Sequence, residues 1–344
     1  MTAPPGPGGY AMPAEWVPHR ATWIAWPHHR GDWPGKFEPI PWAYGEIVRV
    51  LSRHERVCIL VQNSSARAAA RAVLLKVGAD LQKIDFFSIP TDRVWTRDSG
   101  AIFVTNGRGG KIATHWRFNG WAKYPNHKRD DLVAPRIAKA LGLPEHRVLV
   151  GGREVVMEGG AIDVDGEGTL MATEECLLSR VQARNPGLGR NGIERVFADV
   201  LGIRRVVWLD RGIAGDDTHG HIDDLARFIA PGRVLLCQES NARDANYKPL
   251  KANLERLQSE DVDVIPLPMP GPVVFDGQRL PASYANFYIA NGTVLVPTFN
   301  DPRDRIALGI LADCFPGREI VGIHCVDFVW GLGTLHCATQ QEPL

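Results

Sequence analysis

The sequence lacks several features by which large functional classes are identified. Basic and acidic side chains are balanced at 39 each, so the formal net charge is zero. A protein that holds nucleic acid through its overall field carries excess positive charge instead. No stretch reaches the roughly 18 consecutive apolar residues of a membrane-spanning helix, and the first residues lack the basic start and apolar core of a secretory signal peptide. We therefore expect no nucleic acid and no membrane among the partners of this protein.

Cysteine is also scarce, and glycine fingerprints are missing. The six cysteines of the 344-residue chain stand singly, without a C-x-x-C pair, which argues against a disulfide scaffold and favours a cytoplasmic protein with reduced thiols. No G-x-G-x-x-G or G-x-x-x-x-G-K pattern follows a predicted strand, so a standard nucleotide-binding fold has no support.

The residues that are present predict a mixed α/β chain. A hydrophobic content of 44% and a charged content of 23% are typical of a globular protein. Residues 1–12 are rich in proline and glycine and are expected to form a mobile tail, and the tryptophan-rich stretch 16–42 is expected to be packed but irregular. Strands are predicted at 56–61 and 83–89, and hairpins around Asp165-Gly166 and Asn291-Gly292. Helices are predicted at 43–54, 64–76, 130–141 and 301–314. One more helix is predicted to begin at a capping box formed by Asn191 and Glu194.

Five short stretches are dense in polar residues and glycine, and each borders a predicted strand. They span 95–100, 158–160, 216–224, 283–292 and 331–341. Their central residues, Asp98, Glu158, His221, Asn291 and Cys337, recur at near-regular intervals along the chain. This placement indicates one structural unit used repeatedly, with each copy contributing one polar group to a shared centre.

Cys337 is the candidate nucleophile among these residues. A reactive cysteine needs its thiolate, which a cation or a helix N-terminus stabilises, and Gly331 and Gly333 allow a sharp backbone turn just before it. A buried, inert cysteine remains the alternative. The other five cysteines lie in apolar strand or helix patterns, and we expect them to be structural.

His221 and Asp223 stand two residues apart, so on a strand both side chains would share one face. A base and a carboxylate could then meet one substrate. The pair His219-x-His221 with a carboxylate two residues on is also similar to the metal-ligand pattern of metallo-hydrolases, which leaves a metal centre open.

Two further carboxylates complete the candidate site. Glu158 stands in the apolar context VVMEGG and must be paired or functional, because burying a carboxylate uncompensated is costly. Asp98 follows Arg97 and forms either a surface ion pair or part of the site. A cysteine, a histidine and three carboxylates with little local positive charge suit a planar, cationic electrophile, and guanidinium pairs well with carboxylates.

The ordered set of these motifs resembles the agmatine deiminase / Porphyromonas-type peptidylarginine deiminase family of guanidine-modifying enzymes. The resemblance runs in order along nearly the whole chain, through MPAEW at 12–16, WP at 26–27, WTRDSG at 95–100, EGG at 158–160, DGEG at 165–168, GHID at 220–223, SYANF at 283–287, NG at 291–292 and HCATQQ at 336–341. It implies the five-bladed, pseudo-symmetric α/β propeller of the pentein superfamily, formed as a single domain by residues 13–344.

The resemblance also implies a role for each motif residue. Cys337 would be the nucleophile, His221 the general acid and base, and Glu158 the residue that orients His221. Asp98 and Asp223 would hold the guanidinium, and Trp95 and Arg97, from the same motif as Asp98, would complete the substrate site. The resemblance implies neither a metal nor an organic cofactor, and it implies a homodimer.

The implied reaction is hydrolytic deimination of a small guanidino compound through a covalent cysteine adduct. Agmatine, giving N-carbamoylputrescine and ammonia for polyamine biosynthesis, is the leading candidate. The chain departs from the common agmatine deiminase pattern, with GLGTLHC for GGGNIHC, DDTHGH for DETNGH, and a different segment at 115–131. Peptidyl arginine or another guanidine therefore stays open as the substrate, as do an amidinotransferase, a metal-dependent hydrolase and a non-catalytic guanidine-binding protein.

Overall fold

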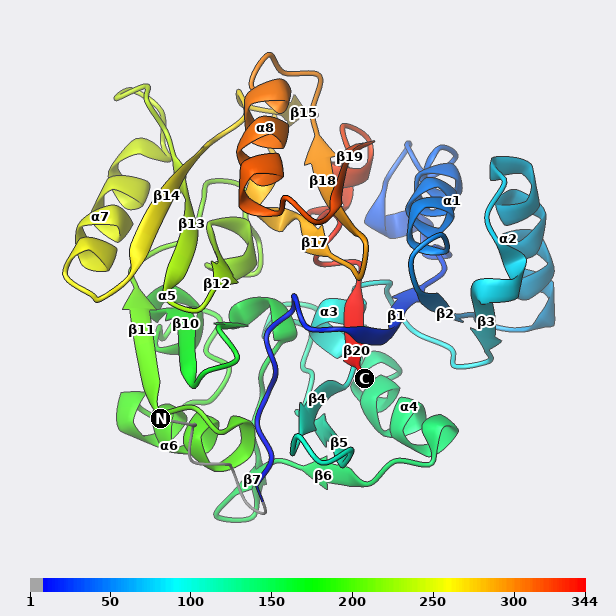
Figure 1. Ribbon diagram of the computed structural model, residues 1–344, viewed down its shortest axis with the longest axis horizontal. Helices are drawn as coiled ribbons and strands as arrows, with labels where there is room; N and C mark the ends of the chain where they lie inside the picture. Colours follow the sequence, from blue (N-terminus) through cyan, green and yellow to red (C-terminus); the bar gives the residue numbers. More distant parts are fainter. Residues whose placement is uncertain (1–8) are drawn as a thin grey trace.

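A computed structural model describes residues 9–344 of the chain, and within them five small sheets of three or four strands surround a common centre (Figure 1). Each sheet is built in the same way. A first strand pairs antiparallel with a second, the chain crosses through a helix, and a third strand pairs parallel with the second. This is a mixed α/β chain, as the sequence predicts.

Four of the units follow one another along the sequence. The strands and helix of the first two are β4 (Ile102–Thr105), β5 (Lys111–His115), α4 (Val133–Leu141) and β6 (Glu145–Arg147), then β9 (Asp163–Val164), β10 (Thr169–Thr173), α6 (Arg190–Leu201) and β11 (Arg205–Leu209). Those of the next two are β12 (Ala226–Ala230), β13 (Arg233–Gln238), α7 (Tyr247–Gln258) and β14 (Asp263–Pro268), then β17 (Tyr288–Ile289), β18 (Thr293–Thr298), α8 (Asp304–Cys314) and β19 (Glu319–His324). Two short ribbons, β7–β8 (Leu149–Val150, Arg153–Glu154) and β15–β16 (Val274–Phe275, Gln278–Arg279), lie outside this pattern.

The remaining unit joins segments from opposite parts of the chain. Strand β20 (Gln340–Pro343) pairs antiparallel with β1 (His19–Ala25), and β1 pairs parallel with β2 (Arg56–Leu60) after helix α1 (Ile40–Leu51). Strand β3 (Ile84–Phe87) extends this sheet by pairing parallel with β2, and helix α2 (Ser64–Val77) connects the two strands. The prediction of an irregular structure for 16–42 is therefore wrong at β1, whose side chains are buried nearly throughout and give no strand-like alternation.

Local sequence explains several of the boundaries. Asn63 caps α2 by accepting a hydrogen bond from the Ala66 amide, and Gly78 ends it in the left-handed conformation. The capping box predicted at Asn191 does not form, because α6 begins at Arg190 and Glu194 accepts a hydrogen bond from the Trp208 indole instead.

The apolar residues form two buried clusters. The larger one lies under the sheets of β1, β13 and β18, and the smaller one joins the sheets of β4 and β10. Of the tail expected at 1–12, residues 1–8 lie outside the described part, whereas Ala11 pairs with Thr105 and Met12 is buried in the smaller cluster. None of the helices within residues 9–344 has the length and apolar character needed to cross a membrane.

Each unit is preceded by a short turn that points to the centre. These turns are α3 (Thr96–Ser99), η4 (Gly159–Ala161), η5 (Ile222–Asp224), η6 (Tyr284–Asn286) and the turn at 334–339 before β20. Turn α3 contacts η4, η4 contacts η5, and η5 contacts η6. The regular spacing of polar residues in the sequence thus reflects five turns that meet at one place.

Candidate active site

Cys337 lies in the turn before β20, with 5% of its surface exposed. The side-chain amide of Asn286 donates a hydrogen bond to Sγ at 3.1 Å, and Asp223 Oδ2 lies 3.6 Å from Sγ. The carbonyl oxygen of Asn286 accepts hydrogen bonds from Thr334 Oγ1 at 2.7 Å and from the His336 amide at 3.1 Å. Asn286 therefore holds both the thiol and the turn that carries it.

The sequence predicts that Asn291 contributes the fourth polar group to the shared centre, and this prediction is wrong. Asn291 lies in the hairpin between β17 and β18 and bonds to the backbone of His19, not to the centre. Asn286, five residues earlier, occupies the position expected for it. The motif SYANF carries Asn286 at the end of η6, so the signal lay in that motif and not in the more conspicuous Asn-Gly turn.

The glycines before Cys337 allow two tryptophan rings to pack closely against the backbone. The residue with positive φ in this turn is Leu332, at 67°. A Cβ at Gly331 would lie 2.6 Å from the Trp33 ring, and one at Gly333 would lie 2.9 Å from the Trp95 ring. Both glycines are needed because two indole rings pack against the backbone, and not because either glycine adopts a positive φ.

His221 is completely buried and surrounded by carboxylates. Its Nε2 lies 3.6 Å from Glu158 Oε2, and its Nδ1 lies 3.9 Å from oxygens of both Asp98 and Asp223. Burial opposes a charged ring, but the charge of Asp98 and the contacts with Cys176 and Glu158 raise the pKa of His221 well above its usual value. The ring can therefore hold a proton ready for a leaving group. His221 caps the turn η5 and does not lie on a strand, so it meets Asp223 for a different reason than the sequence suggested.

Glu158 is held by a cation that sequence analysis missed. Arg184 Nε lies 3.1 Å from Glu158 Oε1, and neither side chain is exposed. Burial disfavours the charge of Glu158, but Arg184 and His221 outweigh it and lower the pKa of this carboxyl. Glu158 is thus an ionised group fixed beside His221.

Asp98 is oriented by a residue from a distant loop. The Trp121 indole donates to Asp98 Oδ2 at 2.9 Å, and the Gly160 amide donates to Oδ1 at 3.0 Å. Burial, together with the nearby charges of Asp223 and Glu158, raises the pKa of Asp98 to about 6. A Cβ at Gly160 would lie within 3.0 Å of His221, Asp98 and Asp223, so glycine alone fits among these three side chains.

The thiol of Cys337 faces negative charge from several sides. Burial, Asp223, Asp224 and Asp98 raise its pKa well above the usual value, and the Asn286 amide works in the opposite direction. The thiol is therefore protonated in the empty site, and a cation placed among these carboxylates would promote its ionisation.

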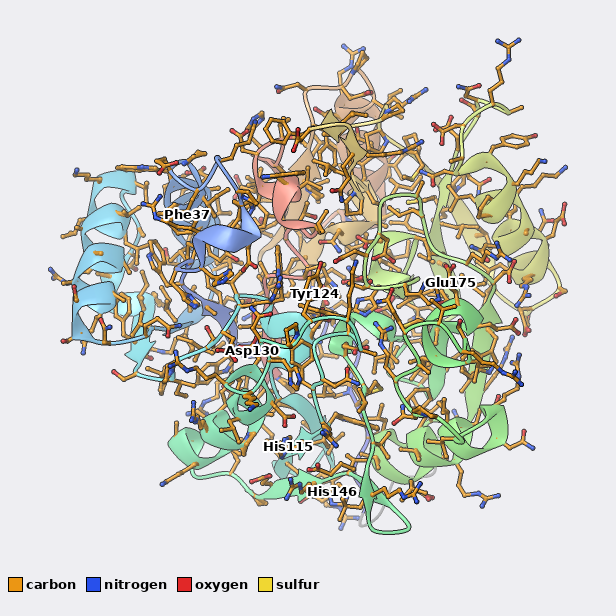
Figure 2. All side chains as sticks on the ribbon, turned by 180° about the vertical axis from the view of Figure 1, so that it is seen from behind. Phe37, His115, Tyr124, Asp130, His146 and Glu175 are labelled. Carbon is orange, nitrogen blue, oxygen red and sulfur yellow. The ribbon has the colours of Figure 1, made fainter. Side chains whose placement is uncertain are left out.

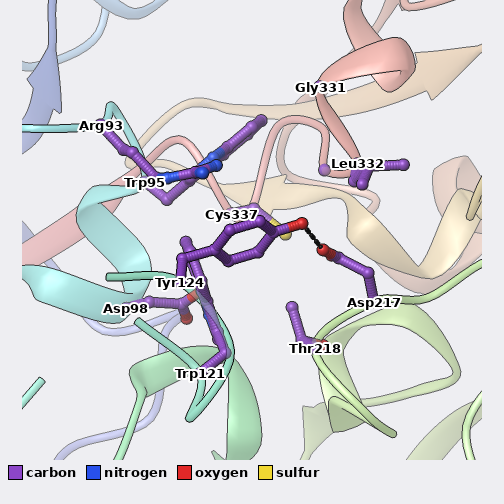
Figure 3. Close-up of a pocket in the computed structure, with 11 residues that line it drawn as sticks. Arg93, Trp95, Asp98, Trp121, Tyr124, Asp217, Thr218, Gly331, Leu332 and Cys337 are labelled. Atoms are coloured by element: carbon purple, nitrogen blue, oxygen red, sulfur yellow. Dashed lines mark hydrogen bonds between the residues drawn. The ribbon is translucent and has the colours of Figure 1, made fainter. Parts of the chain in front are cut away.

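A narrow pocket leads to Cys337 (Figure 3). Its volume is about 20 Å³, and its lining residues are Arg93, Trp95, Asp98, Trp121, Tyr124, Asp217, Thr218, Gly331, Leu332, Gly333 and Cys337. The Tyr124 hydroxyl donates to Asp217 Oδ2 at 2.5 Å, and the Arg93 guanidinium lies 4.1 Å from the centre of the Tyr124 ring. Tyr124 lies near the middle of the molecule in the view from behind (Figure 2). A polar contact that joins two separate loops thus forms part of the pocket wall.

Arg97 does not belong to this pocket, contrary to the expectation that it binds substrate. Its guanidinium is buried on the other side of the turn, where it donates to Gln341 Oε1 at 2.6 Å and to Glu15 Oε2 at 3.2 Å. Trp95 does line the pocket, as expected. Arg97 therefore anchors the turn α3 to the segment that follows Cys337.

Two groups of donor atoms lie close enough to be considered as metal ligands, and we assign neither as a metal site. They are Glu158 with Cys176 and His221, and Asp223 with Asp224 and Cys337. In the first, Glu158 is already paired with Arg184, and in the second the Asn286 amide bonds to both Asp224 and Cys337. Within the described residues His219 belongs to neither group and lies 3.2 Å from Ser179 Oγ, so the His219-x-His221 metal centre is not assembled.

The chain is similar to known proteins over its whole length. The family model of Porphyromonas-type peptidyl-arginine deiminase matches residues 11–343. An agmatine deiminase from Ectopseudomonas mendocina is 36% identical over 372 aligned positions, which cover 100% of this chain and 98% of the relative. The solved structure of Enterococcus faecalis agmatine deiminase has a TM-score of 0.90 and 30% identity, covering 99% of this chain and 98% of that one. C. jejuni agmatine deiminase with substrate bound has a TM-score of 0.87 and 29% identity, covering 97% and 96%.

Proposed function

Because the chain belongs to the Porphyromonas-type peptidyl-arginine deiminase family, we propose that it hydrolyses agmatine to N-carbamoylputrescine and ammonia. The observation that carries this proposal is the position of the Cys337 sulfur, 3.6 Å from Asp223 and at the end of a pocket that Asp98 also lines. A guanidinium held between these two carboxylates would present its central carbon to the sulfur. The similarity to agmatine deiminases over the full length supports agmatine as the substrate.

The first half of the reaction forms a covalent adduct. The guanidinium offsets the negative charge of Asp98 and Asp223, so the Cys337 thiol releases its proton to solvent and the thiolate adds to the guanidinium carbon. His221, charged beside its carboxylates, donates a proton to the departing nitrogen. The C–N bond breaks, ammonia leaves, and an amidino group remains bonded to sulfur.

The second half consumes water. His221, now neutral, takes a proton from a water molecule as its oxygen adds to the same carbon. The C–S bond breaks as the new hydroxyl group becomes the ureido carbonyl, the proton of that hydroxyl passes to the Cys337 sulfur, and the ureido product leaves. Glu158, fixed by Arg184, keeps the His221 ring oriented through both steps. No step requires a metal or an organic cofactor.

The tail of the substrate would reach the pocket mouth. Asp217 lies there among the lining residues, with Lys123 Nζ at 3.2 Å and the Tyr124 hydroxyl at 2.5 Å. We propose that the ammonium of agmatine replaces Lys123 beside Asp217. Two of the departures from the agmatine deiminase pattern reach this pocket, through Asp217 in DDTHGH and through Trp121 and Tyr124 in the segment 115–131, so these residues are the places where substrate choice would be set.

Three further points belong to this proposal. The five sheets with one connectivity support the five-bladed α/β propeller of the pentein superfamily. The six free cysteines fit a reducing compartment, and we propose the cytoplasm. The homodimer implied by the family resemblance is tested by light scattering of the purified protein.

The test is ammonia release from a panel of agmatine, arginine, short guanidino acids and an arginine peptide. Cys337→Ser and EDTA-treated protein serve as controls. The proposal predicts turnover of agmatine that needs Cys337 and survives EDTA. Turnover of another guanidine instead would support the proposed reaction but show that the substrate has a different tail. Transfer of the amidino group to an amine without ureido product would make the protein an amidinotransferase, and no reaction with any guanidine would overturn the proposal.

A further inference from the structure

A glutamine outside the pocket lining connects the two sides of the pocket. Trp121 and Asp98 lie on one side, and Asp217 lies on the other (Figure 3). Gln182 stands in the loop 178–189 before α6. Its side-chain Nε2 donates to the backbone carbonyls of Trp121 and Asp217, at 3.1 Å each. The mechanism above does not use Gln182.

The chemistry of the Gln182 amide fits this position in one orientation. The nitrogen of a primary amide carries two N–H donors, and the oxygen carries none. The atom that faces two carbonyl oxygens must be the nitrogen, because an amide oxygen there would place three acceptors together without a proton. The two N–H bonds of a planar amide diverge at a fixed angle. Gln182 therefore holds the two backbones at a fixed separation.

The backbone is strained on both sides of this contact. Gln182 has a φ of 46°, and Trp121 and Ala122 have φ values of 57° and 52°. This left-handed region is unfavourable for residues other than glycine, and it persists only where the surroundings enforce it. Backbone strain of this kind clusters at sites where the function needs one fixed conformation. The strain points to a function for the contact between the two loops.

The loop of Gln182 is itself anchored beside the general acid and base. Arg184 Nη1 donates to the Gln182 carbonyl at 3.0 Å, and Nε of the same guanidinium pairs with Glu158 at 3.1 Å. Arg184 Nη2 donates to the carbonyl of Thr218, the residue after Asp217. Neither Arg184 nor Glu158 has an exposed side chain. The position of Gln182 is therefore fixed relative to the reacting groups.

These contacts join the two ends at which a substrate would be held. At the guanidinium end, the Trp121 indole donates to Asp98 Oδ2 at 2.9 Å. The Trp121 carbonyl is joined through Gln182 to the backbone of Asp217, at the tail end. The Tyr124 hydroxyl also bonds to the Asp217 carboxylate. Gln182 thus fixes the Asp217 backbone, and Tyr124 fixes the direction of its side chain.

We propose that Gln182 is a positioning residue that determines the chain length of the substrate, because it fixes Asp217 relative to Asp98. A guanidine of matching length places its guanidinium at Cys337 and its ammonium at Asp217 at the same time. A chain that is one methylene shorter or longer loses one of these two contacts. The proposal rests on the proposed function, because Asp98 and Asp217 are assigned there to the two ends of agmatine.

The test compares agmatine with two homologues, one methylene shorter and one methylene longer. In a fitted pocket one methylene changes kcat/KM about tenfold or more, so the wild type should prefer agmatine to both homologues by at least that ratio. Gln182→Met keeps the length of the side chain but has no donor. It should reduce the preference about fivefold or more, the effect of losing one hydrogen bond. Its kcat for agmatine should stay within about threefold of the wild-type value, because the groups around Cys337 are unchanged, and the loss should appear in KM.

A glycine at the same position separates substrate selection from folding. Glycine adopts a φ of 46° without strain, so Gln182→Gly should keep Tm within about 3 °C of the wild-type value. It should nevertheless lose chain-length preference as Gln182→Met does. Asp276→Gly is the matched control, at an exposed residue with a φ of 49° in the turn between β15 and β16. This control should keep both Tm and the preference.

Three results would count against a role for Gln182 in selection. They are an unchanged preference in both Gln182 variants, a wild type that turns over the three guanidines equally, and a preference that falls only together with Tm. If the wild type deiminates none of the three compounds, the proposed function fails. The rise in Tm that each compound produces then tests the selection by Gln182 without turnover, with the same variants and the same expected order.

Discussion

Asn286 donates a hydrogen bond to the Cys337 sulfur from 3.1 Å, and this contact favours the ionised form of the thiol. Asn286→Ala should therefore lower kcat about tenfold to hundredfold, as expected for a hydrogen bond to a charged group. Asn291→Ala, at the hairpin asparagine outside the centre, should leave kcat unchanged. Steady-state kinetics of the two variants measure the difference, and equal kcat values would contradict the role given to Asn286.

The acidic surroundings of Cys337 predict which reagents inactivate the protein. Since burial and three aspartates raise the thiol pKa, neutral chloroacetamide should react slowly at pH 7, and faster as the pH rises toward the pKa. Chloroacetamidine carries its own positive charge, so we expect it to inactivate at least about tenfold faster. Rates are normalised to the reaction of each reagent with free cysteine. Equal normalised rates would mean that the carboxylates do not attract a planar cation.

The Trp121 indole should control the acid limb of the pH profile. Guanidinium binding needs ionised Asp98, so kcat/KM should fall as the pH drops through about 6. The Trp121 hydrogen bond lowers the pKa of Asp98, and its loss in Trp121→Phe should move the acid limb to higher pH. If the acid limb of kcat/KM lies at the same pH in Trp121→Phe as in the wild type, a group other than Asp98 causes it.

The raised pKa of Asp98 also predicts how the stability of the fold depends on pH. The pKa of Asp98 in the folded protein lies above its usual value of 3.8, so the folded state loses stability as the pH rises through about 6. Asp98→Asn removes this loss and should raise Tm by a few degrees at pH 8 but not at pH 4. Calorimetry at the two pH values measures it, and a fall in Tm at pH 8 would contradict the argument.

The buried pair of Arg184 and Glu158 should matter far more for stability than a surface pair. Arg184→Met leaves the Glu158 carboxylate without its cation and should cost about 3–5 kcal/mol of unfolding free energy. Arg190→Met, at an arginine that pairs with Glu174 on the surface, should cost less than about 1 kcal/mol. Urea titrations compare the two variants, and similar losses would show that water reaches Glu158.

Asp217 provides a test of the substrate tail. Asp217→Asn should raise the KM for agmatine about tenfold, because the terminal ammonium loses its counter-charge. Butylguanidine has the same chain without the ammonium, so its KM should change little. If both substrates respond equally, Asp217 closes the pocket through Tyr124 and does not bind the tail.

The parts of this protein that follow local rules were predictable from its sequence. The Asp165-Gly166 and Asn291-Gly292 hairpins and the helix predicted at 64–76, which is α2, depend on residues close together in the chain, and they form as expected. Cys337, His221, Glu158, Asp98 and Asp223 also meet as expected, because family motifs mark them.

What was missed depends on contacts between distant segments. Trp121 reaches Asp98 from a loop with no recognisable pattern, with its own backbone at a positive φ of 57°. Arg184 and Glu158 are 26 residues apart, and the neighbour of Cys337 proved to be Asn286 and not the more conspicuous Asn291. Such pairings are set by how the five sheets pack, which no local pattern encodes.

The pairing of β20 with β1 has a consequence for how the molecule is made. Strand β1 emerges early from the ribosome, but its antiparallel partner is translated some 320 residues later. Until then, one edge of β1 stays open and can pair with other chains. Because Cys337 lies just before β20, the same late event closes the ring and places the nucleophile. A nascent chain of this protein therefore stays inert until its ring is complete.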